Sequence, residues 1–210
     1  MTPEVLKKYQ RRLTDLDDTR KRMESLYDNG HLRDRDIGAV YESLFLRAVV
    51  GFEEFCEQLF FEILKKRVRY KLKEVSPRIP TCSNFVLRQI LLQGKSYLDW
   101  LPYDHAERRA KLYLTGGRPF STLESSDRQM IQTIVIIRNA IAHSSGYSRL
   151  KFRKHVIKDE TLLASEKSPS GFLRSQLTRT PLQRRFEIYA AELGAISAKI
   201  CGTPTWCKRR

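Results

Sequence analysis

Between Asp36 and Lys73, apolar residues recur at helical spacing on more than one side of the helix they would form. They are Ile37, Tyr41, Leu44, Phe45, Val49, Phe52, Phe55, Leu59, Phe60, Ile63 and Leu64. A surface helix carries a single apolar stripe, so a helix apolar over this much of its circumference must be packed on several sides. The sequence therefore predicts a central helix over 36–73, against which the rest of the chain packs.

Other segments carry helix start and stop signals. The first helix is predicted to run from Pro3, capped by Thr2, to the stop at Asn29-Gly30. Further helices are predicted over 85–92, from the capping box Asp104–Glu107 to Gly116-Gly117, over 128–143 after a cap at Ser125, Ser126 or Asp127, and from the capping box Thr180–Gln183 to Cys201.

Strand signals are nearly absent. Only 161–164 and 172–174 could pair as a small hairpin, and the basic, serine-rich stretch 158–180 is typical of a long surface loop. The predicted fold class is an all-α bundle of four to five main helices, with short accessory helices and a long basic loop before the last helix. We expect one domain over 1–201 and a frayed basic tail over 202–210.

Composition narrows the class of protein further. Of 210 residues, 41% are hydrophobic, which is enough to fold, and no window of 18 uncharged apolar residues exists to span a membrane. The N-terminus is charged where a signal peptide needs its apolar stretch, and the four cysteines are too scattered for a disulfide scaffold. We therefore expect a soluble, cytoplasmic protein with no membrane partner.

The net charge is 39 − 24 = +15, and residues 147–185 alone carry ten Lys or Arg against three acids. Such a charge favours a polyanionic partner, because bound phosphates release their counterions. The alternative is that the charge only keeps the protein soluble.

Most motifs that would carry chemistry are missing. The sequence has no H-E-x-x-H, no C-x-x-C and no glycine-rich phosphate loop, so we expect no metal and no cofactor. Of the four histidines, His31 and His105 are expected to be solvated, and His155 lies in the basic stretch. His143 differs, because residues 138–143 read Arg-Asn-Ala-Ile-Ala-His at the end of a very apolar helix. Such polar groups need a cleft, a partner or one another; alternatively, Arg138 forms a helix-end ion pair and His143 a C-terminal cap.

Residues 138–143 resemble the R-N-x-x-x-H signature of the HEPN superfamily of all-α nucleic-acid-processing domains. Four further segments resemble the branch of that superfamily linked to ribosomal L-PSP-type endoribonucleases. They are 52–55 (Phe-Glu-Glu-Phe), 97–103 (Tyr-Leu-Asp-Trp-Leu-Pro-Tyr), 117–120 (Gly-Arg-Pro-Phe) and 171–174 (Gly-Phe-Leu-Arg). The resemblance extends over roughly residues 40–200.

The resemblance implies a dimeric, metal-independent endoribonuclease of toxin or anti-phage defence type, with a site composed of Arg and His from both subunits. The RNA 2′-hydroxyl would attack, His143 would be general base or acid, and Arg138 would stabilise charge on the phosphate. Asn139 would orient the histidine or contact a phosphate oxygen. The residues expected to hold RNA are Lys151, Arg153, Lys154, His155, Ser144 and Tyr147. Further expected partners are a second copy of the chain and a cognate inhibitor or defence-complex subunit.

Two other functions remain open: a non-catalytic HEPN module that binds RNA or a nucleotide, and a dimerising scaffold in a larger complex. A DNA-binding protein is disfavoured, because no helix has base-reading residues in helix-turn-helix spacing. Geometry leaves a second question open. Five steps of a regular helix place Arg138 and His143 about 140° apart. Their side chains converge only with a two-fold partner or a distortion at the helix end.

Overall fold

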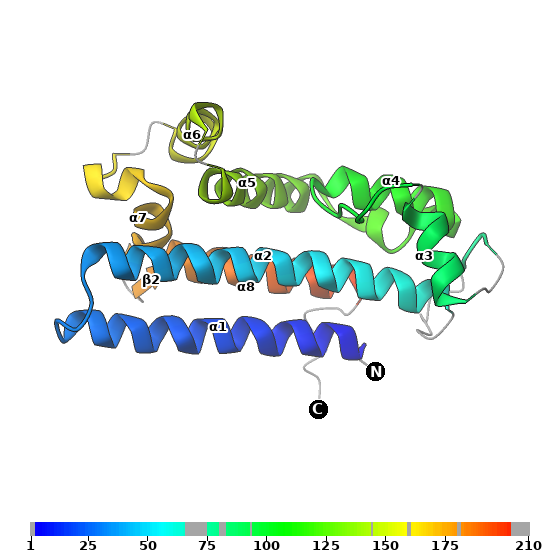
Figure 1. The fold of residues 1–210 in the computed structure, drawn as a ribbon, viewed down its shortest axis with the longest axis horizontal. Coiled ribbons are helices and arrows are strands. Elements are labelled where there is room, and N and C mark those ends of the chain that lie inside the picture. Colours follow the sequence, from blue (N-terminus) through cyan, green and yellow to red (C-terminus); the bar gives the residue numbers. More distant parts are fainter. Residues whose placement is uncertain are drawn as a thin grey trace.

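The computed structural model describes residues 3–65, 75–79, 83–92, 94–143, 145–158, 161–179 and 182–202. This part of the chain contains eight α-helices and one two-stranded sheet (Figure 1). The helices are α1 (Glu4–Asp28), α2 (Asp34–Leu64), α3 (Asn84–Leu92), α4 (Tyr103–Tyr113), α5 (Ser125–Ala142), α6 (Gly146–Phe152), α7 (Pro169–Arg174) and α8 (Arg185–Ile200). The strands are β1 (Gln176–Arg179) and β2 (Leu182–Arg184), which pair antiparallel. The predicted all-α class is confirmed.

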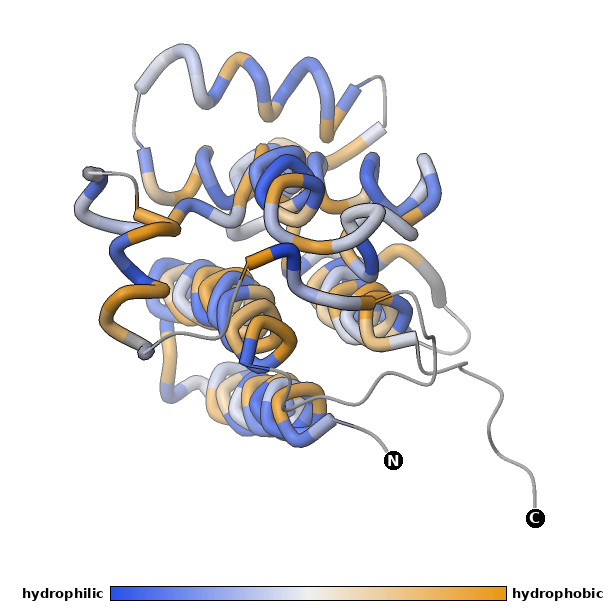
Figure 2. Tube along the Cα trace, turned by 90° about the vertical axis from the view of Figure 1, so that its right-hand side faces the viewer, coloured by the Kyte–Doolittle hydropathy of each residue, from blue (hydrophilic) through white to orange (hydrophobic). Residues whose placement is uncertain are grey.

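Helix α2 runs through the middle of the bundle, with α1 along one side of it and α5 along another (Figure 1). Helices α7 and α8 also pack against α2. Every apolar position predicted for this helix is buried, which confirms its central place. Figure 2, which looks along the long helices, shows hydrophobic and hydrophilic residues alternating along each of them.

The predicted end of this helix at Lys73 is wrong. Ile63 and Leu64 are its last buried residues, and Lys65 closes it by donating its backbone N–H to the Phe61 carbonyl at 3.0 Å. Residues 66–74 lie outside the described part, as do Thr2 and 203–210 of the predicted tail.

The predicted starts of two helices also differ. Pro3 is the N-cap of α1 and not its first residue. Asp104–Glu107 is not a capping box, because α4 begins at Tyr103 and Glu107 accepts a hydrogen bond from Arg128 of α5 at 2.7 Å. Helix α4 then ends at Tyr113, and Thr115–Gly117 form a separate 3₁₀ turn. Helix α5 begins at Ser125 with Glu124 as its N-cap, so the predicted cap at Ser125, Ser126 or Asp127 is wrong. The Asp127 carboxylate instead lies in the first turn and accepts from the Glu124 backbone N–H at 3.2 Å.

The long basic loop and the hairpin predicted before the last helix are both wrong. After Lys158 the chain forms a 3₁₀ turn, η4 (Ala164–Lys167), and then α7, whose Phe172 and Leu173 enter the core. Ser168 caps α7 by accepting the Gly171 N–H at 3.1 Å. The hairpin is instead β1–β2, which places Gln183 in a strand and delays the last helix to Arg185.

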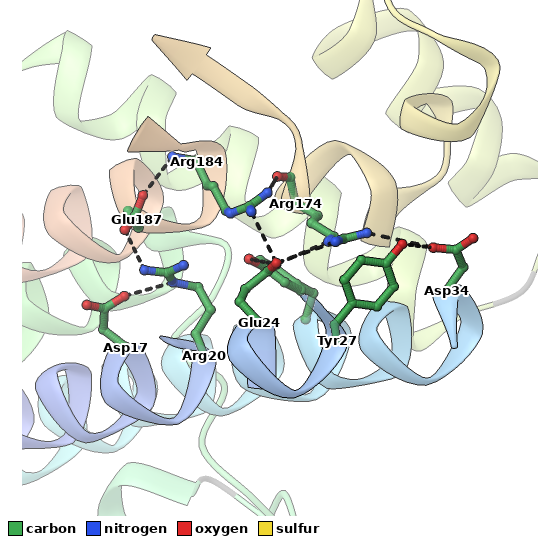
Figure 3. A network of polar contacts seen from close by, with 9 residues as sticks. Asp17, Arg20, Glu24, Tyr27, Asp34, Arg174, Arg184 and Glu187 are labelled. Carbon is green, nitrogen blue, oxygen red and sulfur yellow. Dashed lines mark hydrogen bonds and ion pairs between the residues drawn. The ribbon is translucent and has the colours of Figure 1, made fainter. Parts of the chain in front are cut away.

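A polar network fastens α7 and β2 to the first two helices (Figure 3). At its centre is Glu24 of α1, which is only 7% exposed. Its carboxylate accepts from the Tyr41 hydroxyl at 2.6 Å, from Nε of Arg174 at 3.1 Å and from Nη2 of Arg184 at 3.1 Å. The Arg174 guanidinium also stacks over Tyr27, 4.0 Å from the ring centroid. Arg174 of the predicted basic loop and Arg184 of the predicted last helix are therefore structural.

The described buried apolar residues form one hydrophobic cluster. None of the described helices is long and apolar enough to cross a membrane.

Candidate functional site

The candidate site lies at the C-terminal end of α5. Ile134 and Ile137 are fully buried and fix this helix to the bundle, and Ile141, one turn further, is half-buried. Arg138 and Asn139 are both half-buried, and Nη1 of Arg138 donates to Oδ1 of Asn139 at 3.0 Å. The structure therefore pairs Asn139 with the arginine and not with the histidine, to which the sequence analysis had linked it.

His143 lies just beyond the helix. Its backbone angles (φ −124°, ψ 112°) are extended, and its N–H donates to the Asn139 carbonyl at 3.0 Å. The side chain is exposed and has no polar partner among the described residues. The extended backbone at His143 is a distortion of the helix end within one chain. Such a distortion was one of the two ways, beside a two-fold partner, in which the side chains of Arg138 and His143 were expected to converge. His143 is the C-cap residue of α5, as the alternative interpretation expected, and it caps through its backbone N–H.

Glu53 of α2 is a neighbour of Arg138 that the sequence analysis did not assign to the site. Burial raises the pKa of the half-buried Glu53 carboxyl, the positive charge of Arg138 lowers it, and the negative charge of Asp99 raises it. The net shift of this pKa is upward. A charged residue between the buried Phe52 and Phe55 was the available signal. Its partner could not be read from the sequence, because α2 and α5 meet only in the folded bundle.

Five predicted RNA-binding residues are exposed directly after the candidate site. Lys151 lies on α6, and Arg153, Lys154 and His155 lie on η3, a turn of π-helix over Arg153–Ile157. Tyr147 is 67% exposed, and the Lys151 ammonium lies 4.7 Å from its ring centroid. Helix α6 packs against α5, so this cationic surface adjoins the end of α5. Ser144 lies outside the described residues.

The rest of the basic stretch does not continue this surface. Arg174 and Arg184 bind Glu24, and Arg185 is buried against Ser175, to which its Nη1 donates at 3.0 Å. Arg185 also stacks over Phe172, 4.6 Å from the ring centroid. Among the side chains of the basic stretch that the structure describes, the exposed cations are Arg149, Lys151, Arg153, Lys154, Lys158 and Lys167.

The other three histidines differ in their exposure to solvent. His31 and His155 are exposed. His105 is not fully solvated, because its Nδ1 is buried 2.9 Å from the Asp99 carboxylate. Among the described residues, no group of three or more His, Cys, Asp or Glu could hold a metal ion.

The segments that carried the family resemblance are mostly core. Phe52, Phe55, Trp100, Phe120 and Phe172 are all 2% exposed or less. A Cβ at Gly171 would overlap the Ser165 carbonyl, so this position has no room for a side chain. Outside 138–143, the aromatic residues of these segments pack in the core, whereas Glu53 lies in the electrostatic field of Arg138.

Comparison with known proteins adds no relative. No family model matches the chain, no curated protein matches it, and no solved structure matches it.

Proposed function

We propose that this protein is a HEPN-type endoribonuclease that cleaves RNA at the end of α5. The observation that carries the proposal is that the exposed His143 ring, which has no polar partner among the described residues, follows the Arg138–Asn139 pair at the end of α5. An exposed imidazole is available for proton transfer, and a held guanidinium is a preorganised site for a phosphate. The cationic surface of α6 and η3 supports the same function, because it can hold the RNA backbone beside these groups.

In the proposed reaction, His143 takes the proton of the RNA 2′-hydroxyl, and the resulting oxygen attacks the adjacent phosphorus. The bond from phosphorus to the 5′-oxygen breaks, and that oxygen receives a proton from a general acid. The products are a 2′,3′-cyclic phosphate and a free 5′-hydroxyl. Arg138 stabilises the charge that builds on the phosphate, while Asn139 holds the guanidinium.

The base and the acid lie on opposite sides of the phosphorus in such an in-line displacement. One His143 cannot fill both positions at once, so the reaction calls for a second imidazole. A two-fold dimer supplies it as the His143 of the partner subunit. In the cytoplasm, such an enzyme of toxin or anti-phage type would need a cognate inhibitor or a defence-complex subunit to restrain it.

The test compares the wild type, His143→Ala and the control His31→Ala, which removes an exposed histidine elsewhere. Each is incubated with total RNA in EDTA. We expect the wild type and His31→Ala to cleave, leaving cyclic phosphate or 3′-phosphate ends, and His143→Ala to be inactive. Cleavage that EDTA abolishes, and that a divalent ion restores on unstructured RNA, would contradict the mechanism.

A non-catalytic HEPN module is the second candidate. One observation favours it: Arg138 already bonds Asn139 and lies in the field of Glu53, as a purely structural arginine would. If the wild type binds RNA but cleaves none, and both Arg138→Ala and His143→Ala unfold less cooperatively, this second function is the correct one.

A further inference from the structure

A cavity of about 520 Å³ is lined by residues of α5, α6 and the η4–α7 segment, among them Ala140 and Ile141 near the end of α5. Its apolar lining comes from Ala140 and Ile141 of α5, Phe152 of α6 and Pro169 of α7. Phe152 is 2% exposed, so this wall belongs to the core and keeps its shape. The volume is in the range of cavities that bind small ligands.

The mouth of this cavity is cationic. Arg149, Arg153 and Lys167 line it, are exposed, and form no ion pair with another residue of the described segments. Glu42 of α2 is the one acid in the described lining, and it is half-buried. A carboxylate repels a phosphate but accepts hydrogen bonds from the N–H groups of a nucleobase. The lining thus combines an apolar wall, a base-edge acceptor and cations for a phosphate.

The position of the cavity relates it to the candidate site. Ala140 in its wall directly follows Asn139, whose backbone carbonyl accepts the N–H of His143 at 3.0 Å. A nucleotide in the cavity would therefore lie next to a phosphate held at His143.

We propose that this cavity is a nucleotide subsite, which takes the base and phosphate of the RNA residue next to the cleaved bond. The proposal rests on the proposed function for the identity of its ligand as RNA. The base lies on Ile141 and Phe152, its edge meets Glu42, and Arg149, Arg153 and Lys167 bind the phosphate.

In the test, the 210-residue chain is titrated with each of the four nucleoside 3′-monophosphates and with inorganic phosphate, and calorimetry measures the binding affinity of each. We expect at least one nucleotide to bind ten-fold or more tightly than inorganic phosphate, because the base contributes contacts of its own. Equal affinity for nucleotide and inorganic phosphate would overturn the proposal and leave only a cationic surface.

Two variants test whether the nucleotide binds in this cavity. Ala164 is exposed on η4 and lines the cavity, so Ala164→Trp should fill it and weaken nucleotide binding at least ten-fold. The matched control is Ala191→Trp, an exposed alanine that lines a different hollow between α1 and α8. Lys167→Ala should weaken binding about three- to ten-fold without altering the shape of the wall. Unchanged affinity in both Ala164→Trp and Lys167→Ala would show that the nucleotide binds elsewhere.

The same titration on His143→Ala separates this proposal from the proposed function. The variant should bind nucleotide as the wild type does, even though cleavage is lost. If the wild type cleaves no RNA but the Ala164→Trp effect holds, the subsite stands and the nuclease fails. If cleavage depends on His143 while no nucleotide binds, the nuclease stands and the subsite fails.

Discussion

The hydrogen bond between Arg138 and Asn139 distinguishes these two residues from His143, the third polar residue at the end of α5. Arg138 and Asn139 hold each other, whereas His143 lies outside the helix with its ring free of described partners. The sequence could identify all three, because polar residues in an apolar helix end require an explanation. It could not show which two are joined. Nor could it reveal the charge of Glu53 facing Arg138 from another helix.

At this scale we predict unequal losses of cleavage. Arg138→Ala should reduce the rate by about two orders of magnitude, as expected when charge stabilisation is removed from a phosphate. Asn139→Ala should reduce it by only about ten-fold, because the guanidinium remains but is less well held. The measurement is single-turnover cleavage at saturating protein, with Gln132→Ala on the exposed face of α5 as the control. A larger loss for Asn139→Ala than for Arg138→Ala would assign the direct role to the amide.

A second residue-scale prediction concerns Gly171. Because an added Cβ overlaps the Ser165 carbonyl, Gly171→Ala should destabilise the fold by roughly 1–3 kcal/mol. Gly194 of α8 is the control, since a Cβ there meets only the Leu13 side chain at 3.4 Å. Gly194→Ala should be neutral or stabilising by up to about 1 kcal/mol. Urea unfolding measures both, and equal effects would contradict the close approach at Gly171.

The elements of the bundle differ in how far the sequence could predict them. Helices α1, α2 and α5 carry long apolar patterns, and the sequence analysis located them with errors only at their ends. Helix α7 and the β1–β2 hairpin were missed, because serines and basic residues dominate 158–180. The available signals were Ser168-Pro169, which starts a helix, and the adjacent apolar pair Phe172 and Leu173. Capping-box spacing alone predicted the wrong start for two helices. The box at Asp104 fails because α4 begins at Tyr103, and the box at Thr180 fails because α8 begins at Arg185.

The network that fastens α7 and β2 predicts a pH-dependent stability. Burial alone would raise the pKa of Glu24, but hydrogen bonds from Arg174 and Tyr41 and the charge of Arg184 bring it below its ordinary value. A carboxyl with a lowered pKa stabilises the fold above its unfolded-state pKa, and this stabilisation is lost as the pH falls through the folded-state value. We therefore expect the free energy of unfolding to fall on acidification below about pH 4.5.

The variant Glu24→Gln should flatten this acid limb, and Glu24→Ala should cost about 3 kcal/mol at neutral pH by leaving two arginines without their acceptor. Asp28→Asn, an exposed carboxyl near the end of the same helix, is the control. Chemical unfolding at a series of pH values gives the comparison. An acid limb that stays as steep in Glu24→Gln would mean that other carboxyls produce it.

The exposed cations of α6 and η3 lead to a prediction about RNA binding and its salt dependence. Reversing the charges of Lys151, Arg153 and Lys154 should weaken RNA binding and reduce the salt slope by roughly 0.7 for each RNA phosphate that the protein no longer neutralises. Reversing Lys7, Lys8 and Arg11, which are exposed on α1, changes the net charge equally and is the control. Identical effects in the two triple variants would show that only net charge matters.

At the scale of the whole molecule, the proposed reaction depends on symmetry. If each phosphate needs His143 from two subunits, a dimer with one defective copy is inactive. After co-refolding equal amounts of wild type and His143→Ala, activity should therefore be about one quarter of that of the same total amount of wild type. Independent sites would give about one half. Mixing with His31→Ala should leave full activity, and light scattering should report a dimer at micromolar concentration.

The Glu24 network also has a consequence for the order in which the protein is made. Glu24 precedes its partners Arg174 and Arg184 by 150 and 160 residues. At roughly 5–20 residues per second, a ribosome needs about 8–30 s to synthesise the intervening chain. Helices α1 and α2 are neighbours in sequence and can pair during that interval, with the carboxylate of Glu24 still lacking both arginines. The contact that ties α7 and β2 to α1 can thus form only after β2 has emerged, so the polar network is completed long after α1 and α2 are available to pair.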